Sequence, residues 1–284
     1  MLRSTSPARV HARVARWKRD GLRVAFVPTM GALHEGHLSL VRRARASADR
    51  VVASIFVNPL QFGPREDFAC YPRPARRDRA LLAAAGVDLL WEPLARDVYP
   101  AGHRTRVRVV GLGDVLEGAS RPGHFEGVTT VVLILLEVVA PDVLWLGQKD
   151  AQQALLVERM VGDLRLPVKV RRGPIVRAPD GLALSSRNAY LAPAERAQAV
   201  ALSRGLAAAR AALAAGERSA ARVTRAVRAV WRRYALVRED YVAVVDAATL
   251  EPLKDLGAAR RVLVAVAARV GPARLIDNFE WRSR

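Results

Sequence analysis

Two histidines separated by two residues have the types and spacing that most directly suggest chemistry. His34 and His37 flank Gly36 within residues 30–37, which follow the apolar run 24–29. The apolar run predicts a strand and the next residues a helix start, whose backbone N–H groups attract anions. Two imidazoles there can donate hydrogen bonds to phosphate oxygens as charge develops on them. The segment therefore predicts binding of a nucleoside triphosphate and reaction at one of its phosphorus atoms.

Two other interpretations of the histidine pair stay open. It could be half of a zinc site, although zinc usually takes three or four protein ligands and the chain offers only His11, His103, His124 and Cys70 besides. It could also be two ordinary polar residues at a helix start. The segment is neither a Walker loop, since no Gly-Lys-Ser/Thr follows, nor a Gly-x-Gly-x-x-Gly dinucleotide turn.

Polar residues also follow two other apolar runs. Residues 58–62 come after the run 51–57, and Gln61 offers both a donor and an acceptor to a small ligand with hydroxyl and carboxylate groups. A loop stabilised by an amide explains that segment equally well. Residues 147–153 come after the run 143–146, and Lys149 can neutralise a phosphate in a chain where lysine is rare. The alternative for this segment is a capped helix with a surface lysine.

A later segment supplies hydroxyls and a cation on a connection between domains. Ser185, Ser186 and Arg187 could close on a triphosphate and stabilise the departing pyrophosphate. A serine- and asparagine-rich turn is the plainer alternative. His124, within residues 121–127, either caps a helix or lines the pocket.

The elements that must position these residues alternate between strands and helices in the first part of the chain. We expect strands over 23–28, 51–57, 87–91, 105–110, 143–146 and 168–171, and helices over 37–48, 75–85, 124–139 and 150–164. This order predicts an α/β fold with a doubly wound parallel sheet, in which ligands bind at the carboxyl ends of strands.

After residue 176 the pattern changes. Ala178-Pro179-Asp180-Gly181 is a turn signal. Helices over 193–215 and 219–234 and strands over 241–245, 261–267 and 273–278 then predict a smaller C-terminal α+β domain. We therefore expect two domains, residues 1–176 and 177–284.

Composition narrows the class of protein. With 284 residues and 51% hydrophobic residues the chain can build a full core. Its net charge of +19 is carried mainly by dispersed arginines, so we expect a solvated surface that attracts anionic substrates rather than nucleic acid. Residues 1–20 lack a secretory signal, and the apolar run 128–140 is too short to cross a bilayer. The single Cys70 excludes an internal disulfide and fits a cytoplasmic location.

Taken together, these segments resemble the pantothenate synthetase (pantoate–β-alanine ligase) family. The matching residues are 28–37, 54–62, 117–125, 147–150, 180–188 and 274–278, in family order along nearly the whole chain. The resemblance implies a Rossmann-like ATP- and pantoate-binding domain, and a C-terminal domain that closes over the ATP site. It also implies a cytoplasmic homodimer and kinship with the nucleotidylyltransferase superfamily. The implied reaction converts ATP, (R)-pantoate and β-alanine to pantothenate, AMP and diphosphate through pantoyl adenylate, with Mg²⁺ carried by ATP.

The resemblance also assigns residues. The catalytic residues would be His34, His37, Lys149, Ser186 and Arg187, and the family makes His37 the proton donor. The ATP-binding residues would be Met30, Gly31, Ala32, Leu33, His34, Glu35, Gly36, His37, Gly147, Gln148, Lys149, Asp150, Val176, Leu184, Ser185, Ser186 and Arg187. Gln61 and Gln153 would bind pantoate, and Gln61 would also bind β-alanine.

The sequence departs from the family in three respects. Gln148 stands where the family usually has Glu, and of an acidic run associated with metal only Asp78 matches in type, so no protein ligand for a metal is assigned. The high positive charge is not a family trait. Two alternative functions remain: a nucleotidylyltransferase that moves AMP or CMP onto a phosphate-bearing substrate, and a basic nucleic-acid-binding module.

Overall fold

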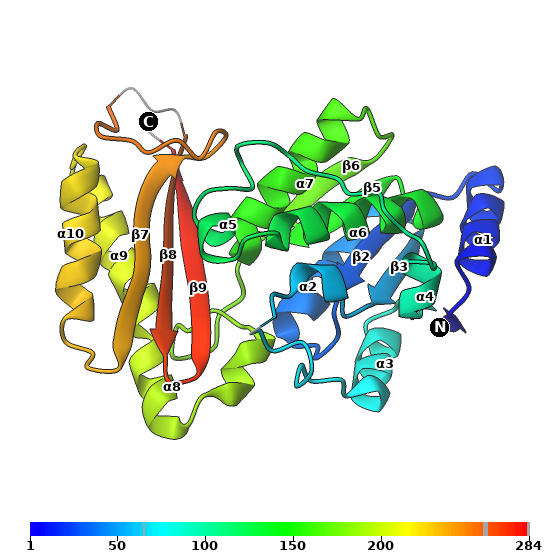
Figure 1. Ribbon diagram of the computed structural model, residues 1–284, viewed down its shortest axis with the longest axis horizontal. Helices are drawn as coiled ribbons and strands as arrows, with labels where there is room; N and C mark the ends of the chain where they lie inside the picture. The colour runs from blue at the N-terminus through cyan, green and yellow to red at the C-terminus, as the bar shows by residue number, and fades with distance from the viewer. Residues whose placement is uncertain (65, 258–260, 283–284) are drawn as a thin grey trace. The chain divides into compact units, whose positions relative to one another are not determined.

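The computed structural model of this chain describes residues 1–64, 66–257 and 261–282. The chain divides into two compact units, Met1–Pro174 and Ile175–Arg284 (Figure 1). This division falls slightly before the expected boundary, so Val176 belongs to the second unit.

The first unit holds a six-stranded parallel sheet. In spatial order its strands are β1 (Leu2–Ser4), β4 (Leu89–Trp91), β3 (Arg50–Ile55), β2 (Val24–Thr29), β5 (Val143–Gly147) and β6 (Lys169–Gly173). The chain winds outward from β2 in one direction and from β5 in the other, which confirms the doubly wound α/β fold. β2 and β5 are therefore neighbours at the switch point, beyond whose carboxyl ends such sheets bind ligands.

Helices cover both faces of this sheet because its strands are apolar on both sides. Ala25 and Val27 pack in one cluster with α2 (Glu35–Ser47) and α3 (Ala75–Ala84). Val24 and Phe26 point to the opposite face. There they share a cluster with the other three long helices, which are α1 (Pro7–Arg19), α6 (His124–Val139) and α7 (Ala151–Asp163). Short helices α4 (Ala95–Val98) and α5 (Glu117–Ser120) lie in the connections.

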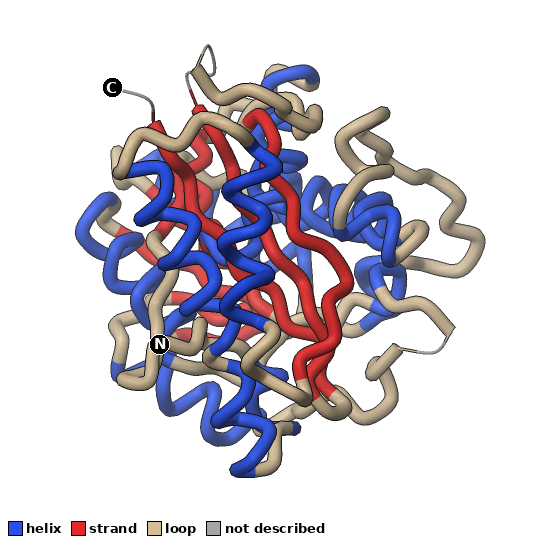
Figure 2. The backbone as a smooth tube through the Cα atoms, turned by 90° about the vertical axis from the view of Figure 1, so that its left-hand side faces the viewer, coloured by secondary structure: helices blue, strands red, loops and turns tan. Residues whose placement is uncertain are grey.

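The second unit is the expected α+β arrangement. Its antiparallel sheet consists of β7 (Val237–Asp246), β8 (Arg261–Val270) and β9 (Ala273–Arg282). The helices α9 (Ala201–Ala214) and α10 (Ala220–Trp231) cover one face of that sheet (Figure 2). The predicted helix over 193–215 is interrupted at Val200, which separates α8 (Pro193–Ala199) from α9 but keeps helical angles of φ −62° and ψ −13°. Over the described residues, no helix combines the length and apolarity that a membrane span requires.

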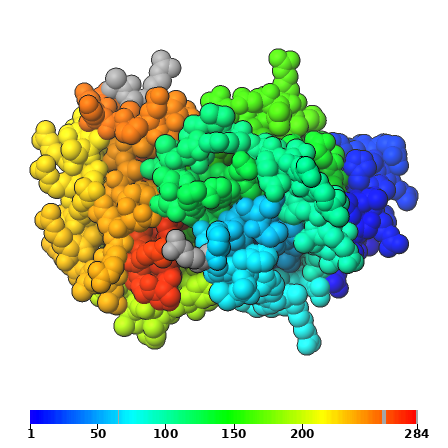
Figure 3. All heavy atoms as spheres, viewed as in Figure 1, coloured from blue at the N-terminus to red at the C-terminus, as the bar shows by residue number. Residues whose placement is uncertain are grey.

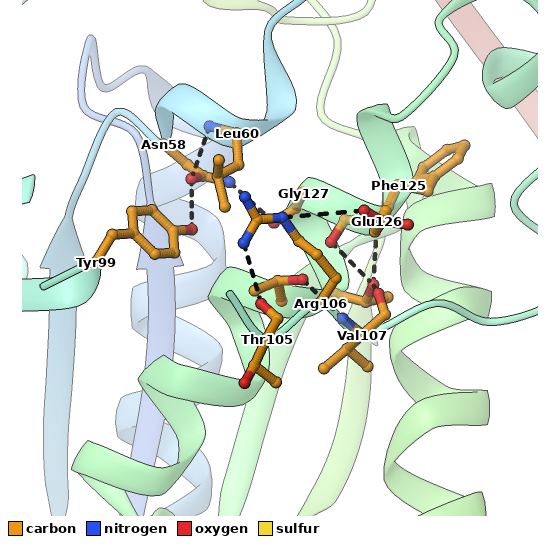
Figure 4. A network of polar contacts seen from close by, with 11 residues as sticks. Asn58, Leu60, Tyr99, Thr105, Arg106, Val107, Phe125, Glu126 and Gly127 are labelled. Carbon is orange, nitrogen blue, oxygen red and sulfur yellow. Dashed lines mark hydrogen bonds and ion pairs between the residues drawn. The ribbon is translucent and has the colours of Figure 1, made fainter. Parts of the chain in front are cut away.

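The predicted edge strand over 105–110 is wrong. The backbone of Val107 is bonded to side chains of α6 instead: its N–H donates to Thr130 Oγ1 at 2.9 Å, and its carbonyl accepts from Thr129 Oγ1 at 2.5 Å (Figure 4). The edge position belongs to β1, which pairs with β4. The helix α1 that follows β1 was not predicted; it lies at the surface of the first unit (blue in Figure 3) and buries Val10 and Val14.

Candidate active site

The loop between β2 and α2 is held in shape by a buried carboxylate. Asp78 in α3 is only 1% exposed, and its two oxygens accept the N–H groups of Ala32 at 2.8 Å and Leu33 at 2.9 Å. Ala32 has a φ of +49°, a conformation that a residue with a Cβ rarely adopts. A Cβ at Gly31 would lie 3.0 Å from Asp78 Oδ2. Asp78 therefore fixes the turn that delivers His34 to the start of α2.

His34 and His37 cap the first turn of α2 reciprocally. The Nδ1 atom of His34 accepts the N–H of Gly36 at 3.1 Å, and the Nδ1 atom of His37 accepts the N–H of His34 at 3.3 Å. The two ring centroids are 4.1 Å apart. Burial, together with the charge of Lys149, lowers the pKa of His34 to about 4. Burial, together with the proximity of His34, lowers the pKa of His37 to about 3. Both imidazoles are therefore neutral at pH 7.

The capping bonds also decide which nitrogen of each ring carries the proton. A neutral imidazole has one N–H and one acceptor nitrogen, and both Nδ1 atoms are used as acceptors. Each ring consequently carries its proton on Nε2. The pair offers two N–H donors at a helix N-terminus, which suits the oxygens of a phosphate.

The end of β5 brings a cation to the same place. Gly147 is the last residue of β5, and residues 148–150 form a 3₁₀ turn before α7. Lys149 Nζ lies 3.4 Å from Asp150 Oδ1. The positive charge of Lys149 lowers the pKa values of the two histidines, and the negative charge of Asp150 raises them. A Cβ added at Gly147 would meet no atom within 4 Å, so the strand ends beside open space. The polar ends of β2 and β5 thus meet at the switch point, as the sequence predicts.

Gln61, in the polar segment 58–62, reaches the loop of residues 30–37, here called the histidine loop. It is the last residue of the 3₁₀ helix Pro59–Gln61 after β3, and its Nε2 donates to the sulfur of Met30 at 3.1 Å. The structure thus brings one predicted pantoate-binding residue to the first residue of the loop. Gln153, the other one, is half-buried in the first turn of α7. Its neighbour Gln152 is buried and bonds the carbonyls of Leu112 and Val115, both at 2.8 Å.

Sequence reasoning did not find the support beneath Gln61. His124 Nδ1 donates to the Gln61 carbonyl at 2.8 Å, and Arg121 Nη1 donates to His124 Nε2 at 2.9 Å. These roles follow because a guanidinium can only donate. Burial and the charge of Arg121 lower the pKa of His124 to about 4, so this ring is neutral too. Arg121 also holds Glu66, at 2.7 Å through Nε and 2.5 Å through Nη2. His124 is the first residue of α6. Its ring binds the carbonyl of Gln61 and does not cap the helix.

The remaining predicted ATP-binding residues belong to the second unit. Val176 and Leu184 are joined because the N–H of Leu184 donates to the carbonyl of Val176 at 2.9 Å. Within the same hairpin, Arg177 binds the buried carboxylate of Asp277 in β9 at 2.5 Å and 3.0 Å. This ion pair fastens the hairpin to the sheet of the second unit.

Ser185 ends that hairpin and starts the next element. Its hydroxyl oxygen accepts the N–H of Arg187 at 3.3 Å and caps the 3₁₀ helix Ser186–Tyr190. The serine pair and Arg187 are half-buried. Ser185, Ser186 and Arg187 therefore lie together at the N-terminus of this short 3₁₀ helix.

Comparisons with known proteins identify relatives along nearly the whole chain. Residues 3–280 match the family described as Pantoate-beta-alanine ligase. The chain is 54% identical to a pantothenate synthetase of Moorella thermoacetica, with 95% of each chain covered, and 55% identical to one of Heliobacterium modesticaldum, with 92% of each covered.

Solved structures are similar as well. The crystal structure of pantothenate synthetase from Thermus thermophilus is 50% identical with a TM-score of 0.93, covering 98% of this chain and 99% of that one. A pantoate-beta-alanine ligase from Francisella tularensis, solved in complex with β-γ ATP and β-alanine, is 33% identical with a TM-score of 0.79, covering 98% of this chain and 97% of that one. The family model matches nearly the whole chain, and the relatives and solved structures agree with it in sequence and fold. The chain therefore belongs to the pantoate–β-alanine ligase family.

Proposed function

We infer that this protein carries out the reaction of its family. ATP, (R)-pantoate and β-alanine react to give pantothenate, AMP and diphosphate through a pantoyl adenylate. The observation that carries the assignment of residues is the pair of Nε2–H donors that His34 and His37 present beside Lys149.

In the first step the carboxylate of pantoate attacks the α-phosphorus of ATP and diphosphate leaves. Residues 30–37 and 147–150 bind ATP, so that His34 and His37 donate hydrogen bonds to phosphate oxygens as their charge grows. Lys149 adds a positive charge at the same place. Neutral histidines suit this task, because a neutral imidazole is already a hydrogen-bond donor and needs no proton from solvent.

Residues of the second unit also take part in this proposal. Val176, Leu184 and Ser185 bind ATP, while Ser186 and Arg187 stabilise the departing diphosphate. Arg187 suits this role because a guanidinium can bind phosphate oxygens in a bidentate manner.

In the second step the amine of β-alanine attacks the carbonyl of pantoyl adenylate and AMP leaves. Gln61 and Gln153 hold pantoate, and Gln61 also faces β-alanine. Gln61 is suited to hold a carboxylate or hydroxyl oxygen because its Nε2–H₂ group lies at the histidine loop. The thioether of Met30, which accepts from this group, is a weak acceptor that a substrate oxygen can replace.

Mg²⁺ enters this proposal bound to the phosphates of ATP. Both oxygens of Asp78 already accept backbone N–H groups in a buried position, so this carboxylate does not fit a metal ligand. We further propose a cytoplasmic homodimer that acts on small molecules and binds neither membrane nor nucleic acid.

The experiment that tests the function is an assay of substrate dependence. AMP should form in quantity only when ATP, pantoate and β-alanine are all present, and mass spectrometry should detect pantoyl adenylate when β-alanine is left out. Release of AMP without dependence on pantoate would contradict the proposal. A gel shift with DNA or RNA that survives physiological salt would contradict the part on nucleic acid.

A His37→Ala variant tests the central assignment. Removing a donor aimed at developing charge typically lowers kcat by about 10²- to 10³-fold. Near-normal turnover of this variant would remove His37 from the mechanism.

A further inference from the structure

One buried side chain, Asn58, has all four of its hydrogen-bonding positions occupied. It is 1% exposed. Its Oδ1 accepts from the Tyr99 hydroxyl at 2.7 Å and from the N–H of Leu60 at 3.2 Å. Its Nδ2 donates to Gln61 Oε1 at 3.0 Å and to the carbonyl of Gly127 at 3.0 Å. Figure 4 shows Tyr99 reaching Asn58 from the side opposite α6.

These partners fix which end of the Asn58 amide faces Gln61. If the oxygen and nitrogen were exchanged, Nδ2 would face the N–H of Leu60 and Oδ1 would face the carbonyl of Gly127, so two hydrogen bonds would become repulsive contacts. Asn58 therefore presents a donor to Gln61. The Gln61 carboxamide must therefore accept with Oε1, and this turns its Nε2 toward Met30 and the histidine loop.

Tyr99 is the third residue in this series of hydrogen bonds, after Gln61 and Asn58. It follows α4, and its ring contacts the rings of Phe56 and His103 at centroid distances of 6.2 Å and 5.1 Å. Burial raises the pKa of the Tyr99 hydroxyl, so this group stays protonated and acts as a donor. It donates to Asn58 Oδ1 and so adds a fourth hydrogen bond that holds the amide in the position described above.

We propose that Tyr99 is a positioning residue that holds Asn58, and through it the Gln61 carboxamide, in the orientation that turns Nε2 toward the substrate. The group that this carboxamide receives is then an acceptor, such as a carboxylate or hydroxyl oxygen. This inference rests on the proposed role of Gln61 in holding pantoate. Tyr99 touches neither the loop nor the reacting atoms in this account, and acts only by orienting another side chain.

The test is a double-mutant cycle of Tyr99→Phe and Gln61→Ala, with KM measured separately for pantoate and for ATP. Phenylalanine keeps the ring contacts and removes only the hydroxyl. Loss of one buried neutral hydrogen bond predicts a rise of about 3- to 10-fold in the KM for pantoate. The KM for ATP should stay close to that of the unaltered enzyme, and the midpoint of thermal unfolding should fall by only about 2–4 °C. In the Gln61→Ala background the same substitution should have no further effect on the KM for pantoate.

Tyr234→Phe is the matched control, because the Tyr234 hydroxyl also has a side-chain partner, Arg204, but lies in the second unit. It should leave both KM values unchanged. An unchanged KM for pantoate in Tyr99→Phe, or an effect that persists at full size without the Gln61 amide, would overturn the inference. If Gln61→Ala by itself left the KM for pantoate unchanged, the proposed role of Gln61 would fail first. The two failures are therefore distinguishable.

Discussion

Asp78→Asn tests whether a buried carboxylate shapes the histidine loop. Hydrogen bonds to charged groups contribute about 1.5–3 kcal/mol each. Asparagine can keep one of the two bonds, to Ala32 or to Leu33, but its N–H₂ group must then face the other backbone N–H. The φ of +49° at Ala32 itself costs about 1 kcal/mol or more, which the carboxylate now offsets. We expect the variant to lose about 2–4 kcal/mol, either as global stability or as order in the loop.

Urea unfolding with and without Mg²⁺, and the KM for ATP over a range of Mg²⁺ concentrations, separate these outcomes. The free energy of unfolding should fall equally with and without Mg²⁺, or the KM for ATP should rise by about tenfold or more. Asp163→Asn is a matched control, because Asp163 is exposed and pairs with Arg159 at 3.9 Å; a change within about 0.5 kcal/mol is expected there. If Asp78→Asn unfolded and bound ATP like the unaltered protein, or if its defect appeared only as a changed requirement for Mg²⁺, the reasoning would be refuted.

Three further predictions concern charge and packing. The depressed pKa values of His34 and His37 mean that the stability they contribute is present above pH 6.5 and is lost as the pH falls through about 4 and about 3; proton NMR should show neither ring titrating between pH 6 and 7. Gly127→Ala would place a Cβ 2.3 Å from the carbonyl oxygen of Leu60, so chemical denaturation should show a loss of about 3 kcal/mol, and unaltered stability would argue against this close contact. Arg177→Met would leave a buried carboxylate without its cation and should cost about 3 kcal/mol by the same assay, whereas a neutral outcome would mean that the ion pair does not fasten the hairpin.

Local patterns sufficed for the elements that carry the site. The apolar runs before residues 30–37 and 147–150 are strands β2 and β5, and the parallel order brings their ends together. The helix α1 was missed although Ser6 and Pro7 form a recognisable helix start and Val10, Val14 and Trp17 a buried stripe. The error at residues 105–110 has another cause: the alternating valines resemble a strand, but threonines of α6 bond the backbone of Val107.

The supports of the site could not be predicted from local pattern. Asp78 bonds Leu33 across 45 residues, and Tyr99 bonds Asn58 across 41. Each contact joins a single polar side chain to a distant partner and leaves no periodic signal in the sequence. The same holds for His124, whose partner is the carbonyl of Gln61 63 residues away. Residues expected to touch ligand were recognisable by type, whereas those that hold them in place were not.

The reciprocal cap at the start of α2 limits the acid–base chemistry of this enzyme. Because the Nδ1 atoms of His34 and His37 are committed to backbone N–H groups, neither ring has a lone pair left for a proton from the ammonium group of β-alanine. Either histidine could become a base only by releasing the first turn of the helix that positions it. While that turn is intact, the amine must lose its proton to solvent or to another group before it can attack, and in the proposed mechanism we expect the histidines to act only as donors.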